Sequence, residues 1–123
     1  MDAIHVCLNV SDADRAAEWY MDNLGFEESW EFTTGDGGTR NRYVADSNGF
    51  ELQLSDTDGE DSFEDGTAWD HIAVKVEDVD AAFEEIDHHG VVEEPGDQPE
   101  AGARTAFVED PDGHVVELVQ LLD

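Results

Sequence analysis

The sequence predicts an α+β fold made of two tandem βαβββ units, and two observations support this prediction. Apolar residues follow a strand, helix, strand, strand, strand order, and the same order then begins again. Matching segments also recur at nearly constant spacing. His5-Val-Cys-Leu-Asn-Val aligns with His71-Ile-Ala-Val-Lys-Val at an offset of 66 residues, and the turns at 46–49 and 110–113 align at an offset of 64.

The first unit is expected over residues 1–55. Residues 3–10 alternate apolar and polar side chains, as a strand does. Ser11 or Asp12 is expected to cap a helix, which ends at Gly25 because glycine readily adopts the left-handed conformation of a helix C-terminus. Three further strands are expected at residues 26–33, 39–46 and 50–55.

An acidic, glycine-containing segment at residues 56–67 lacks apolar periodicity and is expected to link the two units. The second unit is expected over residues 68–123. Its helix has apolar residues at helical spacing from Val79 and is expected to end at Gly90. Its strands are expected at residues 69–76, 91–94, 103–109 and 114–121. Each unit leaves one sheet face uncovered, so the units are expected to pack through their sheets into one structural domain, within one chain or across a dimer.

The charge balance excludes several classes of partner. There are 33 Asp and Glu residues against 5 Lys and Arg residues, a formal net charge of −28. Nucleic acids and anionic membrane surfaces would be repelled. The N-terminus does not resemble a signal peptide and no apolar run is long enough to span a bilayer, so a cytoplasmic location is expected. Cys7, the single cysteine, excludes an internal disulfide and a thiolate zinc cluster.

A charge of −28 with 39% hydrophobic residues is also compatible with a disordered chain. The strict apolar periodicity argues against disorder, because a solvated chain has no reason to keep it. The sequence therefore favours a folded protein from a very salty cytoplasm, where a Debye length of about 3 Å at molar salt suppresses repulsion between surface carboxylates.

Two histidines and two glutamates obey one repeat spacing. His5 aligns with His71, and Glu51 aligns with Glu117, at the same offset of 66 residues. Both glutamates interrupt apolar strands, where a carboxylate needs a partner. Two imidazoles and two carboxylates, with room for two waters, suit an octahedral divalent transition metal ion. Taken singly, each residue could instead be a core histidine or a surface acid.

Three other histidines are not expected to be ligands. They are His88, His89 and His114. They lie near a predicted helix end or beside a turn, where solvated or helix-dipole positions are the simplest interpretation.

The duplicated unit and the segments Gly66-Thr-Ala-Trp-Asp-His-Ile-Ala-Val and Phe107-Val-Glu-Asp-Pro-Asp-Gly-His-Val-Val-Glu-Leu resemble the vicinal oxygen chelate superfamily, specifically glyoxalase I (lactoylglutathione lyase). The resemblance implies the vicinal oxygen chelate fold and conversion of the hemithioacetal of methylglyoxal and a small thiol to a 2-hydroxyacyl thioester. It implies a metal at a homodimer interface, held by His5 and Glu51 of one chain and His71 and Glu117 of the other. Nickel or cobalt is expected, with zinc, manganese or iron as alternatives. Glu117 is expected to be the base, with Glu51 as its counterpart.

The resemblance is incomplete at the thiol site. Asn9 and Ser55 stand where bacterial relatives usually carry an arginine and an asparagine for the glutathione carboxylates. If the arginines of this chain face the cavity, a small anionic thiol other than glutathione, such as γ-glutamylcysteine, is expected. Three arginines are candidates for binding the carboxylates of the thiol: Arg40, Arg42 and Arg104. In so acidic a chain, pairing of these arginines with neighbouring Asp and Glu residues is the favoured alternative.

Cys7 shares the predicted strand face of His5 and is interpreted as a small buried residue in preference to a group lining the metal site. Two functional alternatives stay open from sequence. One is another enzyme of the superfamily, such as an epimerase, an extradiol dioxygenase or a thiol transferase. The other is a metal-free binding protein of the bleomycin-sequestering kind, which needs no set of four ligands.

Overall fold

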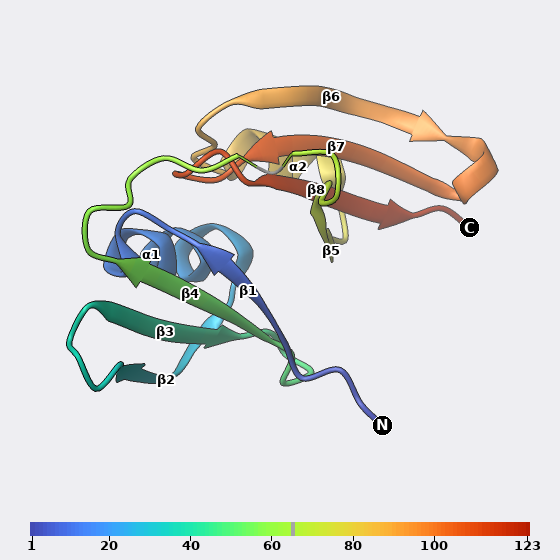
Figure 1. The fold of residues 1–123 in the computed structure, drawn as a ribbon. Helices are drawn as coiled ribbons and strands as arrows, with labels where there is room; N and C mark the ends of the chain where they lie inside the picture. The colour runs from blue at the N-terminus through green and yellow to red at the C-terminus, as the bar shows by residue number, and fades with distance from the viewer. Residues whose placement is uncertain (65) are drawn as a thin grey trace. The chain divides into compact units, whose positions relative to one another are not determined.

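The computed structural model describes residues 1–64 and 66–123, so residue 65 of the expected linker lies outside the described residues. The chain divides into two compact units, Met1–Glu64 and Asp65–Asp123. Each unit has a four-stranded mixed sheet with one helix against one face (Figure 1). The strand orders are β1-β4-β3-β2 and β5-β8-β7-β6. The predicted α+β fold of two βαβββ units is confirmed.

The first unit follows its predicted element order. Its elements are β1 (His5–Asn9), α1 (Ala13–Leu24), β2 (Glu27–Thr33), β3 (Thr39–Ala45) and β4 (Glu51–Thr57). Strand β4 continues two residues past the expected end. The side chain of Asp56 accepts a hydrogen bond from the Ala13 backbone N–H at 2.9 Å and so ties the strand to the start of α1.

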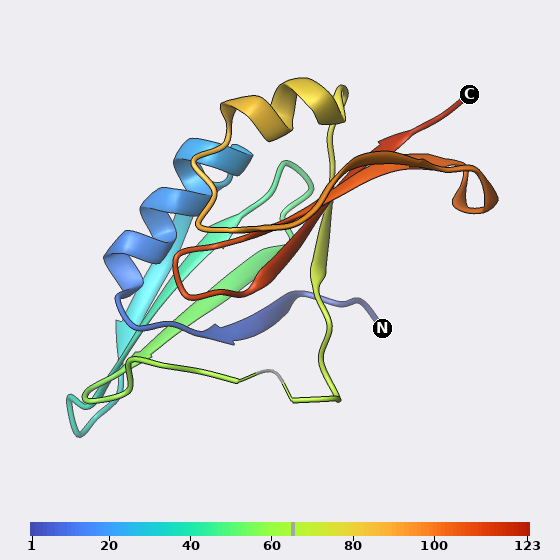
Figure 2. The same cartoon turned by 90° about the horizontal axis from the view of Figure 1, so that it is seen from above.

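Helix α1 begins and ends where the sequence predicts. The Asp12 side chain accepts a hydrogen bond from the Arg15 backbone N–H at 3.1 Å, and Gly25 ends the helix at φ 73°. The side chains of Ala16, Ala17 and Tyr20 are buried against the sheet. Figure 2 shows α1 as a layer alongside the strands of its own unit.

The second unit repeats this order with different lengths. Its elements are β5 (Ile72–Lys75), α2 (Val79–Glu85), β6 (Val91–Gln98), the 3-10 turn η1 (Pro99–Ala101), β7 (Ala103–Glu109) and β8 (Val115–Leu121). The predicted helix end at Gly90 is wrong: α2 ends at Glu85, because Ile86 takes an extended conformation with ψ 132°. Strand β6 runs past its predicted end at Glu94, and Figure 2 shows the long hairpin that it forms with β7.

The pleat of each sheet separates two faces. Leu52 and Leu54 of β4 are fully buried on the face that carries α1, and Val116 and Leu118 of β8 are fully buried in the second unit. The alternate residues point to the opposite face. We call this opposite face the open face of each unit; candidate ligands from both units lie there. Among the described residues, no helix is long and apolar enough to cross a membrane; the expected cytoplasmic location stays a prediction.

Candidate functional site

The first candidate ligand pair lies at the start of β1 and β4. These strands are parallel, and their register places His5 directly beside Glu51. Both side chains therefore lie on the open face. The ring of His5 packs edge-to-face on Tyr43, with ring centroids 5.7 Å apart at 82°. Glu51 accepts a short hydrogen bond from the Ser29 hydroxyl. The predicted proximity of a histidine and a glutamate in this unit is present in the structure.

The second pair is closer. His71 Nε2 lies 2.9 Å from Glu117 Oε1, and the Glu117 side chain is 18% exposed. The other ring nitrogen of His71, Nδ1, lies 2.5 Å from Asp70 Oδ2. Phe107 packs edge-to-face on the His71 ring, with centroids 5.2 Å apart at 88°. The His71 ring is thus held by a carboxylate on one side and an aromatic ring on its face.

The donors of the second pair fit a transition metal ion. When Asp70 accepts the proton of Nδ1, the lone pair of His71 lies on Nε2, the atom that faces Glu117. A carboxylate behind a ligating imidazole is a recurrent arrangement in metal sites. Within the described residues, no group of three or more potential ligands gathers in one place. Each unit therefore supplies a histidine and an oxygen donor, which is half of the expected donor set.

The predicted equivalence of Glu51 and Glu117 is wrong. Strand β4 starts at Glu51 and β8 starts at Val115. The first residue of each strand pairs, in the antiparallel register, with the last residue of the strand before it. Ala45 lies beside Glu51, whereas Glu109 lies beside Val115. The turns at 46–49 and 110–113 and the strands after them thus correspond at an offset of 64, not 66. The counterpart of Glu117 is Gln53.

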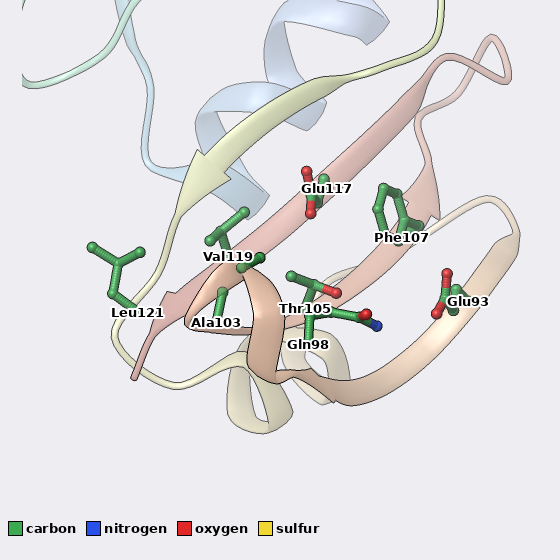
Figure 3. Close-up of a pocket in the computed structure, with 9 residues that line it drawn as sticks. Glu93, Gln98, Ala103, Thr105, Phe107, Glu117, Val119 and Leu121 are labelled. Atoms are coloured by element: carbon green, nitrogen blue, oxygen red, sulfur yellow. The ribbon is translucent and has the colours of Figure 1, made fainter. Parts of the chain in front are cut away.

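A pocket of about 480 Å³ lies on the open face of the second unit beside Glu117. Its lining residues come from β6, η1, β7 and β8: Glu93, Gln98, Ala101, Ala103, Thr105, Phe107, Glu117, Val119 and Leu121. Figure 3 shows Glu117 and Phe107 near one end of the pocket and Leu121 at the other. The hydroxyl of Thr105 is buried and has no hydrogen-bond partner among the described residues. The pocket thus joins a candidate ligand to an apolar wall with a few polar groups.

The arginines predicted to bind substrate in the first unit lie on the helix-facing side of its sheet. Arg42 is paired in register with the buried Leu54, and its side chain is 11% exposed. Arg42 contacts Asp14 at 2.9 Å and Glu28 at 2.7 Å. Arg40 contacts Asp14 at 2.8 Å. The structure therefore pairs them with neighbouring acids and does not bring them to the His5 side of the sheet.

Arg104 has the same arrangement in the second unit. It binds Asp80 of α2 through two hydrogen bonds of 2.8 and 2.9 Å and also contacts Asp97 at 3.1 Å. Its register partner is Gln120, whose side chain accepts a hydrogen bond from the Val79 backbone N–H at the start of α2. Arg104 therefore lies on the helix-facing side, opposite to Glu117.

Two expectations about single residues are wrong. Cys7 is exposed, because it lies on the open face two residues from His5; partial desolvation raises the pKa of its thiol. His114 is 7% exposed, and its backbone N–H donates to Asp110 Oδ1 at 2.9 Å in the turn before β8. His114 is thus a buried residue of this turn instead of a solvated one.

Sequence reasoning missed Lys75 as a candidate site residue. Its register partner is Val119, which lines the pocket, so Lys75 lies on the same open face. Lys75 is exposed, and no ion pair to it is found in the part of the chain that the structure describes. The signal in the sequence was the alternation His71, Ala73, Lys75, which puts this cation on the histidine face.

Comparison with known proteins agrees with this geometry. Residues 3–118 match the Glyoxalase/Bleomycin resistance protein/Dioxygenase superfamily. The chain is 34% identical to a probable lactoylglutathione lyase of Synechocystis sp. over 98% of this chain and 95% of that protein. It is 33% identical to the lactoylglutathione lyase of Haemophilus influenzae over 98% and 93% of the two chains.

Solved structures show the same fold. Glyoxalase I from Zea mays superposes with a TM-score of 0.86 at 27% identity, over 98% of this chain and 45% of the maize chain. This chain thus spans just under half of the maize protein. The match over residues 3–118 covers both ligand pairs, and the chain belongs to the Glyoxalase/Bleomycin resistance protein/Dioxygenase superfamily.

Proposed function

We propose that this chain is a metal-dependent lyase of the glyoxalase I type, which converts the hemithioacetal of methylglyoxal and a small thiol to a 2-hydroxyacyl thioester. The observation that carries the proposal is the pair of His71 and Glu117, 2.9 Å apart, with Asp70 on the far side of the imidazole and a pocket beside the carboxylate. Relatives named lactoylglutathione lyase, which the chain matches over more than nine-tenths of their length, support it.

The proposed metal ligands are His5, His71, Glu117 and one oxygen donor from β4. Glu51 is the donor expected from sequence, and Gln53 shares its face. Two imidazoles with oxygen donors suit nickel or cobalt, the metals we propose, as well as zinc. When bound, a divalent ion supplies Lewis-acid polarisation of the two neighbouring oxygens of the substrate.

Glu117 is the proposed base. The isomerisation moves one proton from the carbon that carries the hydroxyl and the sulfur to the adjacent carbonyl carbon, and the hydroxyl proton passes to the former carbonyl oxygen. A carboxylate beside both carbons performs this transfer by accepting the proton and returning it. Glu117 is suited to this role because its side chain is only 18% exposed and lines the pocket, and Phe107 beside it limits the access of water. The thioester forms without any net loss or gain of atoms.

The pocket beside Glu117 is the proposed site for the thiol portion of the substrate. The unpaired Thr105 hydroxyl and the Gln98 amide offer hydrogen bonds to a peptide-like ligand. Carboxylates of such a thiol need a cation. Lys75 lies on this open face beside Val119, whereas the three arginines face the helices, so we assign the carboxylate to Lys75.

We further propose a homodimer in which His5 and the β4 donor of one protomer share a metal with His71 and Glu117 of its partner. Each unit presents only two of the four donors within the described residues. The open face of the first unit also exposes apolar surface. Trp30 is 50% exposed and Phe32 is 39% exposed, and each of the two rings stacks against the ring of Tyr43. Exposed aromatic surface of this kind is typical of a protein interface.

The activity test measures thioester formation from methylglyoxal with several thiols, in molar KCl, on metal-free protein reloaded with nickel, cobalt, zinc or manganese. The expected result is turnover that requires one of these metals and that falls by about 10²- to 10⁴-fold in Glu117→Gln. Glu84→Gln, an exposed carboxylate on α2, is the charge-matched control and should keep full activity. Metal-loaded wild-type protein without turnover with any thiol would refute the assignment.

Mixing two inactive variants tests the shared site. His5→Ala and Glu117→Gln each damage every site in their own homodimers. A mixed dimer then contains one site with both changes and one intact site. Random exchange should therefore restore about a quarter of the wild-type activity per chain. Restoration near zero, with exchange verified by mass spectrometry, would mean that the ligands of each site come from one chain.

A further inference from the structure

The correspondence between the two units identifies the donor from β4. The first strands and helix caps correspond at an offset of 66 residues, since Asp12 caps α1 and Asp78 caps α2. The later strands correspond at 64. The Val10 backbone N–H donates to the Ser55 carbonyl at 2.9 Å, and the Val76 N–H donates to the Val119 carbonyl at 2.8 Å. The same backbone hydrogen bond therefore occurs in both units, and its donor residues differ by 66 positions whereas its acceptor residues differ by 64.

The aromatic neighbours of the histidines give a second, independent correspondence. Tyr43 packs edge-to-face on His5 and lies beside Gln53 in the register of β3 and β4. Phe107 packs edge-to-face on His71 and lies beside Glu117 in the register of β7 and β8. A histidine, an aromatic ring and a residue of the last strand therefore form matching triads in the two units. The member that matches Glu117 is Gln53.

We infer that the Gln53 carboxamide oxygen, and not Glu51, is the metal ligand that the first unit contributes. This inference rests on the proposed function. In the second unit the donor contacting His71 is the residue diagonal to it across the strand pair, since Glu117 is in register with Ala73. In the first unit the residue diagonal to His5 is Gln53, in register with Cys7.

The contacts of both β4 side chains agree with this assignment. The Gln53 amide nitrogen donates to Asn41 Oδ1 at 2.9 Å, which orients the side chain and leaves its Oε1 as an acceptor. The Glu51 carboxylate is instead engaged by the Ser29 hydroxyl. Asn41 is 3% exposed and therefore a fixed support for the amide. Asn41 thus positions the Gln53 carboxamide, whereas Ser29 holds the Glu51 carboxylate.

The assignment makes the proposed centre asymmetric. A carboxamide oxygen is neutral, so the donor set carries one negative charge from Glu117 where two glutamates would carry two. A carboxamide also cannot accept a proton at neutral pH, so Glu117 is the single base and the first unit contributes none. The symmetric pair of bases that the sequence suggested is replaced by one base and one positioning ligand.

The test measures cobalt binding to the full-length, metal-free protein in molar KCl, by competition with a chromophoric chelator and by the visible absorption of bound cobalt. We expect Gln53→Ala to weaken cobalt binding about tenfold or more and to change the absorption spectrum, as loss of a ligand does. Gln53→Glu should bind cobalt more tightly, because it adds a charged donor. Glu51→Gln, the matched change two residues away, should alter affinity less than twofold and leave the spectrum unchanged.

The opposite pattern, with cobalt binding and spectrum sensitive to Glu51→Gln and insensitive to both Gln53 variants, would overturn the inference and leave the proposed function intact. If wild-type protein binds no cobalt, nickel, zinc or manganese, both fall. Circular dichroism confirms folding of each variant. Gln53→Glu keeps the test decisive if Gln53→Ala does not fold, because an unchanged cobalt spectrum in Gln53→Glu would place residue 53 outside the metal ligands and overturn the inference.

Discussion

Replacement of Asp70 by asparagine should weaken metal binding without touching a metal ligand. Asp70 Oδ2 lies 2.5 Å from His71 Nδ1, on the side of the ring away from Glu117. A carboxylate behind a ligating histidine typically contributes 10- to 100-fold to metal affinity, because it fixes the ring and makes it a stronger donor. The Asp70 side chain is 90% exposed, so solvent screens its charge. We therefore expect the lower end of this range: metal affinity should fall about tenfold, which is about 1.4 kcal/mol of binding free energy.

The assay is a competition titration of metal-free protein with nickel or cobalt. Asp70→Asn removes the charge but keeps an oxygen acceptor, whereas Asp70→Ala removes both and should weaken binding more. Glu77→Gln, an exposed acid in the same unit, is the control for the loss of one charge and should leave the dissociation constant within twofold. Equal losses in Asp70→Ala and Glu77→Gln would show that the carboxylate acts only through the general charge of the surface, and the reasoning from the imidazole contact would be refuted.

Four further predictions concern the base, the substrate and stability. Glu117→Gln should lower kcat by about 10²- to 10⁴-fold with an unchanged circular dichroism spectrum, the range that general-base groups contribute; near-normal kcat would remove Glu117 from the reaction. Lys75→Gln should raise KM for hemithioacetals of carboxylate-bearing thiols and leave KM for an uncharged thiol unchanged, which steady-state kinetics with both thiols decides. The Arg40 and Arg42 guanidiniums lower the pKa of Asp14. Its stabilisation is therefore present above the unfolded pKa of about 3.9 and lost as the pH falls through the lower folded pKa. Arg42→Met should therefore shift the acid-unfolding midpoint to higher pH, and an unchanged midpoint would contradict this. Added KCl should raise the melting temperature of the wild-type chain, because salt screens the repulsion within its −28 charge. An unchanged melting temperature would contradict that expectation.

Local signals in the sequence predicted the elements whose ends depend on local contacts. Helix α1 has both an Asp12 cap and a Gly25 stop, and both act as predicted. Helix α2 begins after the cap Asp78, but it ends at Glu85, where Ile86 turns extended, before the predicted stop at Gly90 is reached. Strand β6 passes through Pro95 because it is the edge strand of its sheet, where a missing N–H leaves no ladder bond unmade. The predicted strand stops at Glu94, the residue before this proline.

The candidate site was predictable in part. The repeat spacing found His5 and His71, because no insertion separates either histidine from the helix cap that follows it. It does not lead to Gln53, the β4 donor that we propose, because the units differ by two residues between the helix cap and the third strand. A glutamate happened to stand at the position that the wrong offset selects. The turns at 46–49 and 110–113, which align at 64, were the signal that leads to Gln53.

Comparison of the two faces of each sheet separates residues that serve the fold from residues that serve the chemistry. On the helix-facing side the units are alike: an aspartate in the first turn of the helix binds an arginine of the third strand, Asp14 with Arg40 and Asp80 with Arg104. The same ion pair occurs in both units on the side away from the candidate ligands, so we attribute to these arginines a role in the helix-sheet contact.

The open faces, in contrast, differ at corresponding positions. Glu117 in one unit corresponds to Gln53 in the other, and Lys75 corresponds to Asn9. The proton acceptor and the cation of the proposed site therefore both come from the second unit, together with the pocket beside Glu117. If the two sheets had equal roles, exchanging residues between corresponding positions would have little effect. The structure predicts the reverse: Gln53→Glu with Glu117→Gln keeps the charge of the donor set but places the carboxylate away from the pocket, so the double variant should bind metal and fail to turn over substrate.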